Sequence, residues 1–192
     1  MSSGELKPWP QVPACYGWLA LDGRGQWRLQ DEVITHPGLI AFLNAHYGVD
    51  ERGCWLVQNG PQQVFVALAG APWIARLHPG QRLLAHDGRS LQPQGAFVFD
   101  GDSRLFVATD AGPAMLDDRD LAAFVDDLRT VDGQAVNEDA LLALIAQDRT
   151  AEPLGWHGHA VIALPASAAD AADYFGFVAA PAAVLPNPAA LG

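Results

Sequence analysis

Alternating runs of apolar residues dominate this chain, and the longest of them extends from Gly53 to Leu77. Asn59-Gly60 and Gly70-Ala71-Pro72 interrupt this run with turn-forming residues, so the pattern predicts a three-stranded β-meander. Both alternating sets of positions in its strands are apolar, which is typical of strands covered on two faces. We therefore expect this meander at the centre of the sheet.

Shorter apolar runs elsewhere predict further strands and several amphipathic helices. Hairpins are expected over residues 16–29 and 96–109, each with an Asp-Gly turn, and single strands over 81–85 and 159–164. Helices are expected to follow each of four capping residues, namely Thr35, Asp117, Asn137 and Ser167.

The two hairpins are related by a shift of 78 residues without gaps. This shift aligns Asp22-Gly23 with Asp100-Gly101 and Leu19 with Phe97, and a helix is expected after each copy. Asp-Gly between apolar residues is also the common hairpin code, so a chance likeness stays open beside a true duplication. A duplication predicts an α+β fold with largely antiparallel sheets, helices packed on them and two similar hairpin-plus-helix units.

The expected units span residues 14–80 and 81–178. The prolines of residues 1–13 predict an extended lead-in, and the Ala- and Pro-rich residues 179–192 predict a flexible tail.

Composition excludes several classes of protein. Half of the 192 residues are hydrophobic, which is enough for a packed core, and 11 Lys and Arg against 22 Asp and Glu give a net charge of -11. Such an acidic surface repels phosphate backbones, so we expect no nucleic-acid partner. No apolar window is long enough to cross a membrane, and the N-terminus lacks the core of a signal peptide, which predicts a cytoplasmic protein. Cys15 and Cys54 have no metal-ligand spacing and are expected as buried thiols.

Four motifs follow one another in the first part of the chain: G-x-L-x-L-D-x-R-G-x-W (Gly17 to Trp27), I-x-H-P (Ile34 to Pro37), G-x-W-x-V-Q-N-G-P-Q-x-V-x-V (Gly53 to Val66) and A-P-W (Ala71 to Trp73). In this order they resemble uncharacterised proteobacterial proteins of a domain-of-unknown-function family, over about residues 14–130. The chain is similar, more distantly, to a neighbouring family with repeated β-rich motifs and helices. That second resemblance implies a role in signal transduction.

The polar loop from Gln58 to Gln63 is a candidate binding surface. Pro61 has no amide hydrogen for a two-residue turn on Asn59-Gly60, so we expect a wider loop that exposes its amides. Amides beside aromatic rings suit a small polar ligand or a peptide. The candidate ligand-binding residues are Trp55, Gln58, Asn59, Gln62, Gln63 and Trp73. A polar loop above a tryptophan core explains the same residues without a ligand.

Candidate chemistry is sparse. His157 and His159 stand at i and i+2 of an expected strand, where both would project from one face as in some metal sites. Neither a G-x-S-x-G elbow nor a phosphate-binding glycine loop occurs. The sequence therefore predicts a non-enzymatic binding or regulatory module without a cofactor, which recognises a small polar molecule or a protein. A metal-assisted hydrolase using the two histidines is the alternative, and the protein is expected as a monomer or a homodimer.

Overall fold

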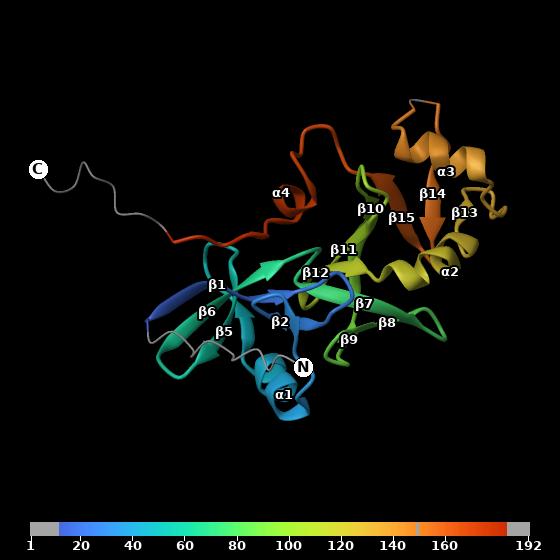
Figure 1. Ribbon diagram of the computed structural model, residues 1–192. Helices are drawn as coiled ribbons and strands as arrows, with labels where there is room; N and C mark the ends of the chain where they lie inside the picture. The colour runs from blue at the N-terminus through green and yellow to red at the C-terminus, as the bar shows by residue number, and fades with distance from the viewer. Residues whose placement is uncertain (1–11, 149, 184–192) are drawn as a thin grey trace, which may run out of the picture.

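The computed structural model describes residues 12–148 and 150–183. Its described residues form two sheets with few helices, which confirms the α+β class (Figure 1). The first sheet has the order β3-β2-β1-β6-β5-β4 and comprises β1 (Ala14–Leu21), β2 (Trp27–Leu29), β3 (Glu32–Val33), β4 (Tyr47–Val49), β5 (Trp55–Asn59) and β6 (Gln62–Leu68).

The second sheet has the order β13-β14-β15-β10-β11-β12-β7-β8-β9. It comprises β7 (Trp73–His78), β8 (Arg82–Ala85), β9 (Ser90–Leu91), β10 (Pro93–Phe99), β11 (Leu105–Thr109), β12 (Gly112–Leu116), β13 (Arg129–Thr130), β14 (Leu154–Trp156) and β15 (His159–Ala163). The helices are α1 (Pro37–Ala45), the 3-10 turn η1 (Asp118–Asp120), which continues into α2 (Leu121–Asp126), α3 (Glu138–Ile145) and α4 (Ala171–Phe175).

The first sheet is repeated inside the second. The order β12-β11-β10-β15-β14-β13 reproduces β3-β2-β1-β6-β5-β4 strand by strand, including the parallel pairs β1·β6 and β10·β15. Register agrees as well, because Leu19 faces Leu29 in the first hairpin and Phe97 faces Val107 in the second, at the same 78-residue shift. A helix joins β3 to β4, and another joins β12 to β13. The predicted repetition of a hairpin-plus-helix unit is confirmed.

The predicted central meander is wrong. Its first two strands are β5 and β6 of the first sheet, whereas its third is β7 of the second, which pairs in parallel with β12. Gly70-Ala71-Pro72 is therefore a crossover between sheets and not a hairpin turn. The sheets divide between Leu68 and Trp73, earlier than the division expected near residue 80. Of the strand pairs in the described residues, ten are antiparallel and three parallel.

Two of the four expected helix caps are confirmed. The side chain of Asn137 accepts a hydrogen bond from the amide of Ala140, and Asp117 caps η1. At α1 the cap is His36 and not Thr35, because Pro37 begins the helix and the His36 imidazole accepts from the Leu39 amide. At α4 the cap is Asp170 and not Ser167.

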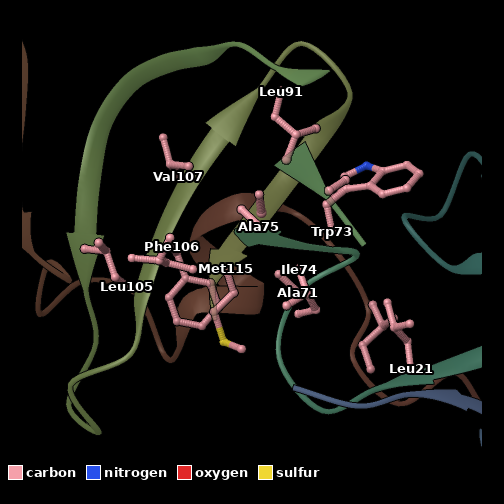
Figure 2. Packing of buried hydrophobic residues seen from close by; sticks show 14 of the residues in the cluster. Leu21, Ala71, Trp73, Ile74, Ala75, Leu91, Leu105, Phe106, Val107 and Met115 are labelled. Carbon is pink, nitrogen blue, oxygen red and sulfur yellow. The ribbon is translucent and has the colours of Figure 1, made fainter. Parts of the chain in front are cut away.

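Most of the buried side chains of the two sheets form one continuous core, and Cys54, Leu56 and Phe65 form a second, smaller cluster. At the junction between the sheets, Trp27, Tyr47, Trp55 and Trp73 pack edge to face or tilted, with ring centroids 4.9–5.6 Å apart. His86 stacks on Trp73 at 5.3 Å and 25°. Figure 2 shows Trp73 with Ile74 and Ala75 beside the apolar residues of β11 and β12. The two units therefore share an interior.

The residues after α4 return to the first sheet. The amide of Val178 donates to the Gly53 carbonyl at 2.9 Å, and the Leu68 amide donates to the Ala179 carbonyl at 2.8 Å. Residue 179, which we expected to begin the flexible tail, is therefore attached to β6. Most of the expected lead-in and tail, residues 1–11 and 184–192, lies outside the described residues. Among described helices, none has the length and apolarity to span a bilayer.

Candidate functional site

The two tryptophans of the predicted binding surface lie in the core. Trp55 is 4% exposed and Trp73 2%, and their rings pack against each other at 5.6 Å. The indole N–H of Trp73 donates to the Ala111 carbonyl at 2.8 Å. Trp55 also begins β5, whereas the polar turn lies at the far end of that strand. The structure therefore does not bring the tryptophans to the polar loop.

The polar loop is tighter than predicted. Asn59 pairs with Gln62, so the turn consists of Gly60 and Pro61 alone. Gly60 has φ +57°, and proline suits the next position of a type II′ turn, where no amide hydrogen is needed. The Gln62 side chain is buried and donates to the Val12 carbonyl at 2.6 Å, and that of Gln58 donates to the Gly60 carbonyl at 2.7 Å. Asn59 and Gln63 are exposed.

The two histidines do not share a strand face as predicted. His157 lies in the β14–β15 turn with φ +45°, whereas His159 begins β15. His157 Nε2 is 3.4 Å from a carboxylate oxygen of Asp127, and His159 Nδ1 is 3.0 Å from the Gly95 carbonyl oxygen. Over residues 12–148 and 150–183, no cluster of three or more His, Cys, Asp or Glu side chains is arranged to hold a metal ion.

A cleft of about 730 Å³ lies where the two repeated units meet. Its walls come from the β1–β2 turn of the first unit and from the equivalent β10–β11 turn of the second. The start of α2 and the end of β12 complete it. The lining residues are Asp22, Gly23, Arg24, Gln26, Arg28, Ala69, Asp102, Ser103, Arg104, Leu105, Met115, Leu116, Asp118 and Leu121.

The first wall is a turn organised by the carboxylate of Asp22. One of its oxygens accepts from the amides of Arg24 and Gln26 at 3.0 and 2.9 Å, and the other accepts from Arg28 Nε at 3.0 Å. Gly25 completes the turn with φ +75°, and a Cβ there would lie 2.4 Å from the Cβ of His86. The turn is thus fixed from within by Asp22 and from behind by the loop before β9.

The second wall repeats this arrangement. Asp100, 78 residues after Asp22, accepts from the amides of Asp102 and Arg104 at 3.0 and 2.8 Å. Its second oxygen accepts from Arg104 Nε at 2.7 Å. Asp50 and Asp87 accept similar hydrogen bonds in other turns, so these bonds by themselves indicate a structural role of the aspartate. What distinguishes Asp22 and Asp100 is that their two turns line one cleft.

The α2 side of the cleft is anchored by ion pairs to its own loop and to β7. The carboxylate of Asp117 binds the Arg119 guanidinium, which lowers the pKa of Asp117 to about 2. Arg76 donates two hydrogen bonds to Asp120, at 2.6 and 3.1 Å, and these hold the pKa of Asp120 below its usual value. These charge-assisted hydrogen bonds attach the start of the helix to β7 and to its own loop, beside the cleft.

The floor of the cleft is apolar. Met115 and Leu116 of β12 and Leu105 of β11 line it from below, together with Ala69. Met115 is the cross-strand partner of Phe106, and Figure 2 shows the two side chains together near Ile74. Its methyl carbon would lie 3.7 Å from a Cβ at Gly23, so the thioether reaches the base of the first wall. Polar walls over an apolar floor are the usual composition of a small-molecule site.

Sequence reasoning missed this cleft, although one signal for it was present. The 78-residue repeat had already paired Asp22-Gly23 with Asp100-Gly101. The repeat in the sequence does not reveal how far apart the two turns lie, because that distance depends on how the sheets pack. The candidate site is therefore the cleft between the equivalent turns and not the loop from Gln58 to Gln63.

Comparisons with known proteins identify relatives but no activity. No curated protein matches the chain. A crystal structure of a DUF1285 family protein from Silicibacter pomeroyi DSS-3 is similar at 14% identity and a TM-score of 0.54, over 86% of this chain and 91% of that one. A second, from Shewanella baltica OS155, matches at 12% identity and a TM-score of 0.40, over 56% and 90%. The first of these supports the fold alone.

A protein-family model covers almost the whole chain. The model, DUF2944, is described as "Protein of unknown function (DUF2946)" and matches residues 2–182. This agrees with the resemblance inferred from the motifs between Gly17 and Trp73. The chain belongs to this family of proteins of unknown function.

Proposed function

We propose that this protein is a non-enzymatic binding or regulatory module that recognises a small polar ligand in the cleft between its two repeated turns. One observation carries the proposal: two equivalent Asp-organised turns, one from each unit, line the same cleft of about 730 Å³. This volume lies within the range of about 300–1,000 Å³ that is typical of small-molecule sites.

The lining chemistry favours binding over catalysis. The fourteen described residues around the cleft include arginines, aspartates, a glutamine and one serine, but neither His nor Cys. Ser103 lies at the tip of a turn with φ +60°, and the lining offers it no imidazole as a general base. Arg28 and Arg104 are held by Asp22 and Asp100. Such groups are preorganised to orient a ligand, which lowers the cost of binding.

The position of the cleft supports a regulatory role. A ligand there contacts both units and would stabilise the folded protein against unfolding by about 2.7 kcal/mol at a concentration one hundred times Kd. A ligand that contacts both units could link its own concentration to the stability of the protein, which is compatible with the signal-transduction role that the more distant resemblance implies. The hydrolase alternative has less support, because His157 and His159 diverge and the described residues provide no third ligand.

Met115 offers a direct test. The chain contains two methionines, Met1 and Met115. A protein labelled with ¹³C in its methionine methyl groups therefore gives two signals, and the variant Met115→Leu assigns the one in the cleft. Titration with a library of small polar molecules should shift the Met115 signal saturably for at least one member. If no member of a broad library shifts it, the cleft is not a small-molecule site and the proposal is wrong.

A further inference from the structure

We propose that the ligand of the cleft is a small zwitterion with an apolar body, such as a short peptide with free ends. This inference rests on the proposed function, since it names the class of molecule that the same cleft would take. It comes from the signs and positions of the charges along the two walls.

The two walls carry opposite charges at the same position of the repeated turn. Arg24 follows Asp22 by two residues, and Asp102 follows Asp100 by two, so the 78-residue shift aligns an arginine with an aspartate. In both, the backbone amide is held by the turn carboxylate, at 3.0 Å. Their side chains are 59% and 81% exposed. The backbone is therefore fixed at each position while the charged group remains accessible.

Of the remaining charges, those of Asp22, Arg28 and Arg104 are committed to the fold. The carboxylate of Asp118 is 69% exposed and is the partner of Arg24. Arg28 donates to Asp22 and to the Asp31 carbonyl at 2.8 Å, and Arg104 donates to Asp100. The contacts of the two accessible groups are longer, at 3.4 Å from Arg24 to Asp118 and 3.4 Å from Arg104 to Asp102. Exposed ion pairs of this kind contribute little to stability, so a ligand can replace them at small cost.

The sum of the charges argues against ligands of a single sign. Three arginines and three aspartates line the cleft, and their formal charges cancel. An anion attracted by Arg24 would be repelled by Asp102 on the opposite wall. A cation would be attracted by Asp102 and repelled by Arg24. The net charge of -11 on the whole chain further disfavours polyanions. A molecule with one group of each sign satisfies both walls at once.

The floor determines the middle of the ligand. Met115, Leu116 and Leu105 form the apolar base of the cleft but are only 6%, 7% and 1% exposed, so a ligand would contact a small apolar area there. A methionine adapts readily to different shapes. A carboxylate at Arg24, an ammonium group at Asp102 and an aliphatic side chain over Met115 together describe a short peptide with free termini. This arrangement also explains why the lining combines charged turns with leucines.

The test uses the dipeptide alanyl-leucine with free ends, its N-acetylated form and its C-amidated form, each followed through the Met115 methyl signal. We expect saturable binding of the free dipeptide and a roughly tenfold to hundredfold loss of affinity when either end is capped, as for a lost charge-assisted hydrogen bond. Arg24→Gln should remove the effect of C-terminal amidation, and Asp102→Asn that of acetylation. Arg82→Gln and Asp132→Asn, at exposed positions outside the cleft, serve as matched controls.

The outcomes separate this inference from the proposed function. Equal binding of a capped and a free dipeptide would overturn it, as would unchanged end preference in both cleft variants. If zwitterions leave the Met115 signal unmoved while another polar molecule shifts it, the ligand class is wrong and the site stands. If nothing shifts the signal, both are wrong.

Discussion

Lowering the pH from 7 to 5 should destabilise the protein through one half-buried histidine, His86. Its ring stacks on Trp73, its Nδ1 accepts from the Ile74 amide at 3.4 Å, and its Nε2 has no hydrogen-bond partner in the part of the chain that the structure describes. Burial lowers the pKa of His86 from 6.5 to about 4. The ring is therefore neutral in the folded protein at neutral pH.

The sign and size of the effect follow from that lowered pKa. Between pH 6.5 and 4 the unfolded chain binds a proton at this position that the folded protein does not. The contribution of neutral His86 to the free energy of unfolding is therefore fully present well above pH 6.5 and is lost as the pH decreases. A difference from 6.5 to about 4 corresponds to about 3 kcal/mol in all. About 2 kcal/mol of this should already be lost at pH 5, above the range where most carboxylates titrate.

Urea titrations at pH 7 and pH 5 measure this loss as a difference in the free energy of unfolding. In His86→Gln, whose side chain does not titrate, the difference should shrink by about 2 kcal/mol. His78→Gln is the matched control, because His78 is exposed. Only the pH dependence is compared, since replacing a stacked ring also changes stability at every pH. A His86→Gln protein with the full wild-type pH dependence would refute the reasoning.

Three further predictions concern the fold. Phe65→Ala should cost about 3–5 kcal/mol in urea, because Phe65 is 2% exposed and stacks on Tyr16 at 4.4 Å; a loss below about 1 kcal/mol would contradict this. Asp100→Ala should cost about 2–4 kcal/mol and Asp22→Ala a similar or smaller amount, because each removes three hydrogen bonds from an equivalent turn; a negligible effect in both would mean that the carboxylates do not fix the turns. Removing the residues from Pro181 onward should leave the melting temperature nearly unchanged, since the attachment to β6 is made by Ala179; a drop of several degrees would show that the tail docks on the body.

Local sequence signals predicted the local structure well. The Asp-Gly turns determine the register of both hairpins, and Asn137 begins a helix as expected. These features depend on residues close together in the chain. The parallel pairs β1·β6, β10·β15 and β7·β12 could not be predicted in this way, because each joins strands that are not connected by a hairpin. The run from Gly53 to Leu77 therefore looked like one meander although its strands belong to two sheets.

The site was harder to predict for the same reason. Trp55 and Trp73 were candidates because aromatic residues serve both cores and ligands, and composition cannot distinguish these roles. The loop was predicted to be wide because the turn was expected on Asn59-Gly60, where Pro61 would have to donate an amide hydrogen. The turn residues are instead Gly60 and Pro61, and the positive φ of Gly60 permits a tight type II′ turn. The cleft needs two turns 78 residues apart to face each other, which only the packing of the sheets determines.

A pair of glycine variants tests most directly whether the cleft binds a ligand. Gly23 lines the cleft, and a Cβ there would point at Met115, with its methyl carbon 3.7 Å away. Gly101 is its equivalent in the other unit, where a Cβ would meet nothing within 4 Å. Gly23→Leu should therefore fill the cleft, whereas Gly101→Leu should leave it open.

The measurement is the affinity of each variant for the polar molecule that shifts the Met115 signal of the wild type, by calorimetry. We expect Gly23→Leu to weaken binding by roughly a hundredfold, as overfilling a pocket should, with a folded protein and an intact urea transition. Gly101→Leu should bind like the wild type. Equal affinity in all three proteins would place the ligand outside the cleft and contradict the account.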